Sequence, residues 1–220
     1  MHSQADPHRG QPVRRTGVST ADARLVAILL HGRGASADDI LGLSREFSVP
    51  DVAYLAPQAS GHTWYPYSFL APIMQNEPGI SSGLGVIASL VDDLEAQGIS
   101  SDRVVLMGFS QGACLTLEFA ARNARKYAGV VALSGGLIGP PGMSRDYAGA
   151  FDGTPVFIGC SDVDAHIPLE RVRESTAVLR RMGATVDDRI YRGMGHTVNQ
   201  DELEAVDALL AKAADVSGAT

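Results

Sequence analysis

Apolar residues along this chain alternate between short continuous runs and segments with helical spacing. Continuous runs are typical of strands buried on both faces, and they predict strands at residues 25–30, 52–55, 104–107, 129–133 and 156–158. A last strand is expected over 185–191. Apolar residues three or four positions apart predict helices around residues 40–47, 84–97, 113–120, 168–183 and 203–210. Strands alternating with helices predict the α/β class, with a doubly wound parallel sheet covered by helices on both faces.

The N-terminal segment lacks this pattern. Residues 1–20 are rich in Pro, Gly and Arg and have no periodicity, so we expect a loosely held N-terminal arm there. The chain has 220 residues and 45% hydrophobic content, which is enough to bury one sizeable core. Residues 21–214 are therefore predicted to form a single domain.

Charge and composition exclude several kinds of partner. The formal net charge of −7 argues against nucleic acid or an anionic membrane surface, because both call for a clustered basic face. No stretch approaches the roughly 18 apolar residues of a membrane span, and residues 1–20 lack the apolar region of a signal peptide. We expect a cytoplasmic protein without stable membrane insertion. The two cysteines are too few for a disulfide scaffold and are predicted to be buried thiols.

A serine stands where a strand turns sharply into a helix. The sequence Gly108-Phe109-Ser110-Gln111-Gly112 lies directly between the predicted strand 104–107 and the helix at 113–120. Glycines on both sides permit a tight turn that presents the serine hydroxyl to a substrate. A second G-x-S-x-G match at residues 79–83 follows Pro78 rather than a strand, and its serines are expected to cap a helix. On the pentapeptide alone, an ordinary strand–helix turn explains Ser110 equally well.

Other reactive side chains follow neighbouring strands. His31-Gly32-Arg33-Gly34 follows the first predicted strand, Asp162 and Asp164 follow the strand at 156–158, and His196 follows the last one. Ligands bind beyond the carboxyl ends of the strands in such sheets, so these residues are expected on one rim with Ser110. The chain order Ser, Asp, His is the order found in α/β-hydrolases.

These residue types suit nucleophilic acyl transfer. A serine hydroxyl is a weak nucleophile at neutral pH, so it needs a base such as His196 to accept its proton, and a carboxylate must orient that imidazole. We favour Asp164 as this carboxylate, because Asp162 is better placed to brace the loop through backbone hydrogen bonds. A metal site made of Asp162, Asp164 and His166 lacks a recognisable ligand spacing.

An oxyanion hole completes the predicted chemistry. Backbone N–H groups aimed at the developing oxyanion are typically worth about 3 kcal/mol each. Gln111, directly after the serine, supplies one candidate donor from the start of its helix. Arg33 is the candidate for the second donor, because the glycines beside it allow a close approach. Taken alone, the sequence at residues 31–34 would be explained by an ordinary glycine turn.

With these motifs together, the chain resembles the phospholipase/carboxylesterase branch of the α/β-hydrolases, which includes the acyl-protein thioesterases. The resemblance rests on residues 29–34, 56–58, 108–112, 164–168 and 195–196. It implies the α/β-hydrolase fold without a large cap domain, a triad of Ser110, Asp164 and His196, and a place for Trp64 near the acyl pocket. The chain departs from that branch at Arg33, where thioesterases generally have Leu, and at Ala165, where Pro is usual.

An aromatic loop adds candidates for substrate binding. Trp64, Tyr65, Tyr67 and Phe69 stand within six residues. In one interpretation, these bulky rings form the wall of a compact apolar pocket beside the rim. In the other, they pack into the core beneath a long loop. Both interpretations stay open. Gly32, Trp64, Tyr65 and Phe69 are the candidate substrate-binding residues.

The sequence therefore predicts a serine carboxylesterase that hydrolyses small, short-acyl esters through an acyl-enzyme on Ser110. No cofactor and no metal are expected. An acyl-protein or small-molecule thioesterase and a lysophospholipase are alternatives of the same chemistry. Two alternatives belong to other classes: a ligand-binding sensor that turns over slowly, and an acyltransferase that prefers an alcohol over water as acceptor. The sequence does not decide the oligomeric state, although compact enzymes of this kind often pair through exposed apolar patches into a homodimer.

Overall fold

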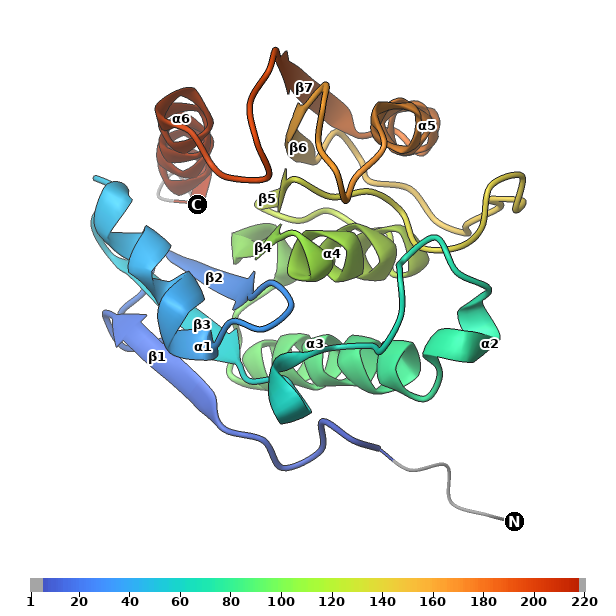
Figure 1. Ribbon diagram of the computed structural model, residues 1–220. Coiled ribbons are helices and arrows are strands. Elements are labelled where there is room, and N and C mark those ends of the chain that lie inside the picture. Colours follow the sequence, from blue (N-terminus) through green and yellow to red (C-terminus); the bar gives the residue numbers. More distant parts are fainter. Residues whose placement is uncertain (1–5, 218–220) are drawn as a thin grey trace.

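The structure, a computed structural model, describes residues 6–217 and contains one sheet in this part of the chain. The strands lie in the order β1-β3-β2-β4-β5-β6-β7 (Figure 1). Every neighbouring pair is parallel except β1 and β3, which are antiparallel. The strands are β1 Val13–Gly17, β2 Leu25–Leu30, β3 Val52–Pro57, β4 Val104–Phe109, β5 Gly129–Leu133, β6 Pro155–Ser161 and β7 Thr185–Tyr191. The predicted, mostly parallel sheet is confirmed.

Helices cover both faces of this sheet. They are α1 Ala37–Leu41, α2 Ile73–Asn76, α3 Gly79–Ala96, α4 Gln111–Arg122, α5 Leu169–Arg181 and α6 Gln200–Ser217. Side chains of β2 alternate between two hydrophobic clusters: Ile28 joins the cluster under α3, α4 and α5, and Leu29 joins the one under α1 and α6. This alternation explains why the whole strand is apolar, because each face of the sheet is covered. None of the helices in the described residues has the length and apolar content that crossing a bilayer requires.

The N-terminal segment differs from the expected loose arm. Residues 13–17 form β1, an edge strand that pairs along β3 from Val13 opposite Pro57 to Gly17 opposite Ala53. Upstream of it, His8 is buried, and its ring Nδ1 accepts a hydrogen bond from the backbone of Ser60 at 3.1 Å. Most of β1 is exposed, so it carries no apolar pattern from which it could have been predicted. Residues 1–5 of the expected arm lie outside the described residues.

The helix predicted at 84–97 begins earlier than expected. α3 starts at Gly79, which places Ser81 and Ser82 inside the helix rather than at its cap. The side chain of Glu77 accepts hydrogen bonds from the backbone N–H of Ser81 at 3.0 Å and from its hydroxyl at 2.8 Å. The second G-x-S-x-G match is therefore helical, and the prediction that its serines cap the helix is wrong.

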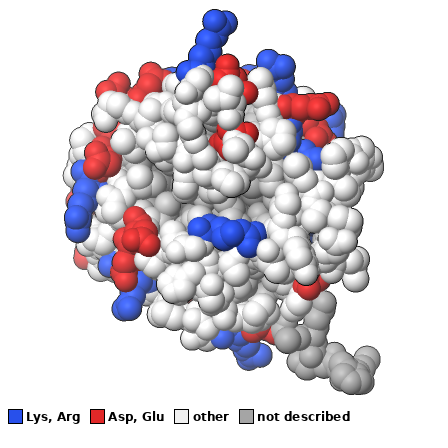
Figure 2. Space-filling view, viewed as in Figure 1, with Lys and Arg blue, Asp and Glu red and all other residues white. Residues whose placement is uncertain are grey.

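The carboxyl ends of the parallel strands meet at one edge of the sheet. The strands β2, β4, β5, β6 and β7 run in the same direction, so the segments that follow them converge there. Figure 2 shows that the face viewed in Figure 1 is hollowed near its middle, with the atoms of a basic side chain in the hollow.

Candidate active site

Ser110 occupies a strained turn between β4 and α4. Its backbone has φ 55° and ψ −117°, a conformation that a serine rarely adopts. The flanking glycines are required by contact: a Cβ on Gly112 would lie 2.1 Å from the carbonyl oxygen of Leu30, and one on Gly108 would lie 2.5 Å from the backbone of Gly112. The predicted reason for both glycines, close backbone approach, is thus present in the structure.

Three side chains far apart in the sequence form a hydrogen-bonded row. The Nε2 atom of His196 lies 2.7 Å from the Oγ atom of Ser110. Its Nδ1 atom lies 2.7 Å from the Oδ2 atom of Asp164. Ser110 follows β4, Asp164 follows β6 and His196 follows β7, so the strand ends bring the three together as the sequence analysis expected.

The environment of Asp164 keeps its carboxyl group ionised. Its Oδ1 atom accepts hydrogen bonds from the backbone N–H groups of His166 at 2.8 Å and Ile167 at 3.0 Å. Burial by itself would raise the pKa of Asp164, but the hydrogen bonds from His196 and from these two N–H groups outweigh it and hold the pKa below its ordinary value. An ionised carboxylate at this position accepts the Nδ1–H of His196 and fixes the tautomer in which Nε2 faces Ser110.

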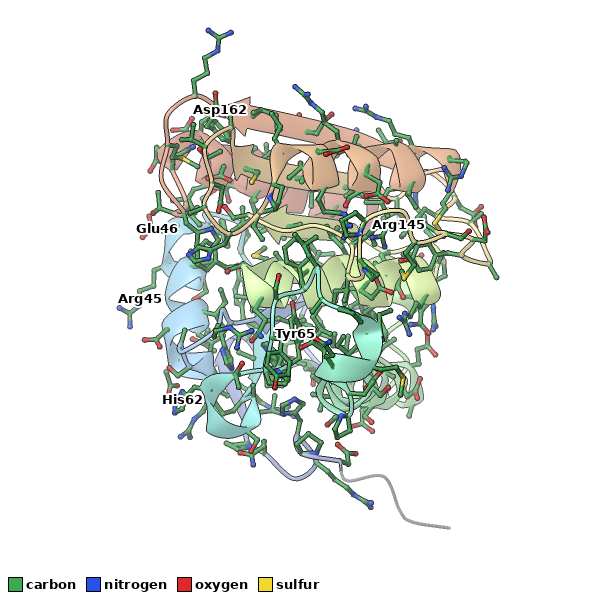
Figure 3. All side chains as sticks on the ribbon, turned by 45° about the vertical axis from the view of Figure 1, so that its right-hand side comes forward. Arg45, Glu46, His62, Tyr65, Arg145 and Asp162 are labelled. Carbon is green, nitrogen blue, oxygen red and sulfur yellow. The ribbon has the colours of Figure 1, made fainter. Side chains whose placement is uncertain are left out.

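Asp162 has the bracing contact that the sequence analysis gave it. Its Oδ1 atom accepts a hydrogen bond from the backbone N–H of Gly193 at 2.8 Å, which joins the loop after β6 to the loop that carries His196. Figure 3 shows Asp162 on a loop at the top of the view, with Tyr65 nearer the middle. Within residues 6–217, no group of three His, Cys, Asp or Glu side chains is arranged to hold a metal ion.

The loop at residues 31–34 passes directly over the serine. A Cβ on Gly32 would lie 3.4 Å from the Cβ of Ser110 and 3.2 Å from the ring of Phe109, so the loop and the turn are in close contact. The backbone N–H groups of Arg33 and Gln111 donate to no acceptor among the described residues. Free N–H groups on both sides of a serine are what an oxyanion hole needs.

His31 holds this loop in shape. The imidazole is fully buried, its Nδ1–H donates to the carbonyl oxygen of Gly32 at 2.8 Å, and its Nε2 accepts from the backbone N–H of Ala59 at 3.1 Å. Burial lowers the pKa of His31, which favours the neutral ring that these two contacts require. His31 therefore supports the loop from below and does not face the cavity.

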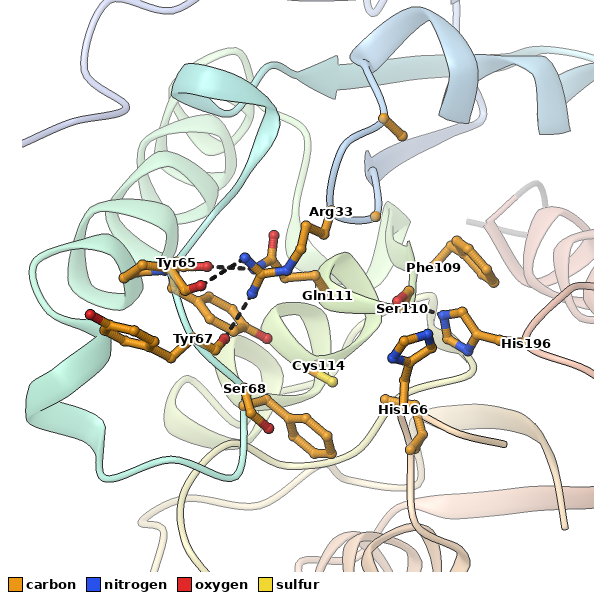
Figure 4. A pocket seen from close by; sticks show the side chains of 15 residues that line it. Arg33, Tyr65, Tyr67, Ser68, Phe109, Ser110, Gln111, Cys114, His166 and His196 are labelled. Carbon is orange, nitrogen blue, oxygen red and sulfur yellow. Dashed lines mark hydrogen bonds between the residues drawn. The ribbon is translucent and has the colours of Figure 1, made fainter. Parts of the chain in front are cut away.

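A cavity of about 580 Å³ opens above Ser110 (Figure 4). Ser110 and His196 contribute to its lining, together with three of the four predicted substrate-binding residues, Gly32, Tyr65 and Phe69. The remaining lining residues are Arg33, Ala35, Pro66, Tyr67, Ser68, Phe109, Gln111, Cys114, His166 and Ile167. The cavity therefore combines aromatic walls with the hydrogen-bonded row, a combination typical of small-molecule sites.

The fourth predicted substrate-binding residue, Trp64, does not line the cavity, so that prediction is wrong. Its side chain is fully buried in the hydrophobic cluster and does not line the cavity. The indole Nε1–H donates to the carbonyl oxygen of His31 at 2.9 Å, and the indole ring lies 5.2 Å from the imidazole rings of His8 and His31. A buried indole must find an acceptor for its N–H, and here that acceptor belongs to the loop above it. Trp64 thus packs beneath the site rather than inside it.

Two polar side chains fasten the aromatic segment that walls the cavity. Gln111 accepts a hydrogen bond from the backbone N–H of Trp64 at 2.8 Å and donates to the carbonyl oxygen of Tyr65 at 2.8 Å. Arg33 donates to the carbonyl oxygens of Pro66 at 2.9 Å and Tyr67 at 2.7 Å (Figure 4). The wall is therefore held by residues that also flank the serine in space.

Several lining residues were missed by the sequence analysis. Phe109 and His166 place their rings 5.1 Å and 4.8 Å from that of His196. Cys114 stands four residues after Ser110 on α4, one helical turn further along the same face, so helical spacing could have indicated it. Ile167 carried no comparable signal, because its position depends on the path of the loop after Asp164.

Comparisons with known proteins show the family to which the chain is similar. A model of the phospholipase/carboxylesterase family matches residues 17–214. The acyl-protein thioesterase 1 of Kluyveromyces lactis is 33% identical over 61% of this chain, and the match spans only 60% of that relative's length. The acyl-protein thioesterase 1 of Saccharomyces cerevisiae is 25% identical over 90% of this chain and 96% of its own length.

A solved structure resembles the chain over nearly its whole length. The phospholipase/carboxylesterase from Dyadobacter fermentans superimposes with a TM-score of 0.88 and is 41% identical. The match covers 96% of this chain and 99% of that one. The predicted α/β-hydrolase fold is confirmed by this similarity together with the family match.

Proposed function

The chain belongs to the phospholipase/carboxylesterase family, and on that premise we propose that it is a serine carboxylesterase acting on small, short-acyl esters. The observation that carries the proposal is the row Ser110–His196–Asp164, with 2.7 Å at each step, opening into a walled cavity. Each partner has the residue type and the distance that nucleophilic acyl transfer requires.

The first half of the reaction forms an acyl-enzyme. The Oγ atom of Ser110 attacks the ester carbonyl carbon while the Nε2 atom of His196 takes the hydroxyl proton. The carbonyl oxygen becomes an oxyanion, which accepts hydrogen bonds from the backbone N–H groups of Arg33 and Gln111. When the intermediate collapses, the bond to the leaving oxygen breaks, and the proton on His196 passes to the leaving alcohol. Asp164 stabilises the imidazolium during both transfers.

The second half releases the acid. A water molecule takes the place of the alcohol beside His196, gives a proton to Nε2, and attacks the acyl carbon. The bond to the Oγ atom of Ser110 breaks, and Ser110 recovers its proton from His196. The strained backbone of Ser110 holds its hydroxyl at the cavity for both halves, so no rearrangement of the turn is needed.

Small substrates are favoured by the way the cavity is walled. The rings of Tyr65 and Phe69 are buried, 2% and 6% exposed, so they present a fixed surface rather than a mobile one. The carbonyl oxygen of Phe69 also accepts a hydrogen bond from the backbone N–H of Gly139 at 2.8 Å, which ties the aromatic segment to the opposite loop. A wall fastened on two sides supports a short acyl group better than a long flexible chain.

Thioester hydrolysis is the second candidate, because the curated relatives named above are acyl-protein thioesterases. The same attack, oxyanion and water steps apply when the leaving group is a thiolate, which takes the proton from His196 as it departs and so leaves the imidazole neutral for the water step. The two candidates differ in leaving group and chain length, so matched oxygen and sulfur esters of one acyl group separate them.

The test is a chain-length series of 4-nitrophenyl esters from acetate to palmitate, measured with the wild type and Ser110→Ala. We expect kcat/KM to be highest for short chains and turnover to be lost in Ser110→Ala while its circular dichroism spectrum stays unchanged. A maximum at long chains would reject the short-acyl assignment, and full activity in Ser110→Ala would reject the nucleophile. Stoichiometric labelling of Ser110 by a fluorophosphonate without multiple turnover on any ester would indicate a sensor.

A further inference from the structure

Arg33 places an uncompensated positive charge in the cavity. It is the only Lys or Arg among the described residues that line the cavity, and no Asp or Glu lines it. None of the ion pairs in the described part of the chain includes Arg33. In Figure 2 the atoms of a basic side chain in the hollow are surrounded by uncharged residues, which agrees with a cavity lining that holds one basic side chain and no acidic one among the described residues.

Among the described residues, the acceptors that hold the guanidinium in place are all neutral. Nη1 donates to the hydroxyl of Thr63 at 3.1 Å and to the carbonyl oxygen of Pro66 at 2.9 Å, and Nη2 donates to the carbonyl oxygen of Tyr67 at 2.7 Å. A guanidinium has five N–H donors, so these contacts leave the Nε–H and one hydrogen on Nη2 without an acceptor in the described part of the chain. Donors on two neighbouring nitrogens suit a carboxylate, which accepts two parallel hydrogen bonds.

The position of Arg33 points to the acyl side of the substrate. Figure 4 shows Arg33 and the tyrosine segment on one side of Ser110 and His196 on the other. The leaving oxygen must lie beside the Nε2 atom of His196 to receive its proton, so the leaving alcohol occupies that side. The acyl chain then extends away from His196, toward Arg33 and the aromatic wall.

We propose that the preferred substrates are esters whose acyl part ends in a carboxylate, that is, hemiesters of short dicarboxylic acids, and that the Arg33 side chain recognises this carboxylate. This assignment rests on the proposed esterase function and deepens it. The substrate carboxylate supplies the missing acceptors, and because no carboxylate within residues 6–217 lines the cavity, it meets no like charge from that part of the chain. The chain carries a net charge of −7, which does not attract anionic substrates. Selectivity for a substrate carboxylate therefore has to come from the local charge of Arg33.

The expected effect is on binding rather than on the chemical step. The guanidinium contacts a part of the substrate that does not react, so its loss raises KM more than it lowers kcat. Charge-assisted hydrogen bonds are worth enough to change affinity by about tenfold to a hundredfold. The contacts to Thr63, Pro66 and Tyr67 already immobilise the side chain, which reduces the entropy lost on binding.

The experiment compares monoethyl glutarate with ethyl pentanoate, in which a methyl group replaces the carboxylate, by following ethanol release. For the wild type we expect a higher kcat/KM with monoethyl glutarate. In Arg33→Gln the ratio of the two kcat/KM values should fall at least about tenfold, mainly through KM, and Arg33→Lys should recover part of it. Arg45→Gln, which removes an exposed arginine that does not line the cavity, is the matched control and should keep the wild-type ratio.

Thr63→Val separates recognition from support of the wall. It removes one acceptor of Arg33 and leaves the charge, so the ratio should stay within about threefold of the wild type. An unchanged ratio in Arg33→Gln, or an equal fall in Thr63→Val and Arg33→Gln, would overturn the proposal and leave Arg33 as a loop clamp. A wild type that hydrolyses ethyl pentanoate and rejects monoethyl glutarate would also overturn it. Failure to hydrolyse any ester, 4-nitrophenyl acetate included, would instead refute the proposed function.

Discussion

Glu202 allows a sharp prediction about stability, because its carboxyl group is buried and incompletely paired. It lies in the first turn of α6 with no exposed surface. Its Oε2 atom accepts a hydrogen bond from the backbone N–H of Asn199 at 2.9 Å, whereas Oε1 has no hydrogen-bond partner within residues 6–217. The carboxyl group packs directly on β6, since a Cβ on Gly159 would lie 2.1 Å from Oε1.

Burial, opposed by the hydrogen bond from Asn199 and assisted by the charge of Asp201, raises the pKa of Glu202 from 4.5 to about 7. The folded protein thus binds this proton more tightly than the unfolded chain does. The stability that results is fully present below pH 4.5 and is lost as the pH rises through 7. The interval between the two pKa values corresponds to about 3 kcal/mol of unfolding free energy.

The assay is urea unfolding of the wild type and Glu202→Gln at pH 5 and pH 8.5. Glutamine keeps the acceptor for Asn199, and the cost of its unpaired amide N–H group is the same at both pH values, so it cancels in the difference between them. Between these values the wild type should lose about 2 to 3 kcal/mol more than the variant. Glu204→Gln on the exposed side of α6 is the control and should follow the wild type. If the wild type and Glu202→Gln lose the same unfolding free energy between pH 5 and pH 8.5, within about 0.5 kcal/mol, the burial argument is refuted.

Three further predictions follow from packing. Gly112→Ala should destabilise the fold by about 3 kcal/mol or more in thermal unfolding, because its Cβ would meet the carbonyl oxygen of Leu30. Gly85→Ala on the open side of α3 should instead stabilise the fold by about 0.5 to 1 kcal/mol. Equal changes in unfolding free energy for Gly112→Ala and Gly85→Ala would contradict the contact argument. Cys114 and Cys160, buried with pKa values raised to about 12, should resist iodoacetamide at pH 8 until guanidinium unfolds the chain. Rapid alkylation of the native protein would refute this. Deletion of residues 1–17 should lower the thermal midpoint by roughly 5 °C or more, because it exposes the edge of β3, and an unchanged midpoint would show that β1 adds nothing.

The sheet and the reactive rim could be predicted because their signals are local. β2, β5 and β7 have the predicted bounds, and β3, β4 and β6 extend their predicted runs by a few residues at most. A strand covered on both faces must be apolar at every position, which leaves an unambiguous run in the sequence. Once the strands are known, parallel pairing alone brings the residues that follow them, including Ser110 and His196, to one edge.

Elements whose contacts lie far away in the sequence could not be predicted in the same way. The helix expected around residues 40–47 is a five-residue α1 followed by a 3-10 turn at Gly42–Glu46, because its apolar residues pack on partners contributed by other elements. β1 gains its hydrogen bonds from β3 and carries no burial pattern of its own. Trp64 stands among residues that line the cavity, yet its indole turns toward His31, and only the three-dimensional course of the loop decides between these sides.

The wall and the proposed oxyanion hole are physically coupled. Arg33 and Gln111 provide the two backbone N–H groups beside Ser110, and their side chains fasten the carbonyl oxygens of Tyr65, Pro66 and Tyr67. A leucine, the residue expected at position 33 from the thioesterases that the sequence resembles, has no side-chain donor for the carbonyl groups of Pro66 and Tyr67. A chain with leucine there must hold its aromatic segment by other contacts or leave it freer to accept long acyl chains. We therefore expect the proposed acyl-length preference and the proposed charge preference to change together when residue 33 is substituted, because the Arg33 side chain fastens the wall and also carries the charge.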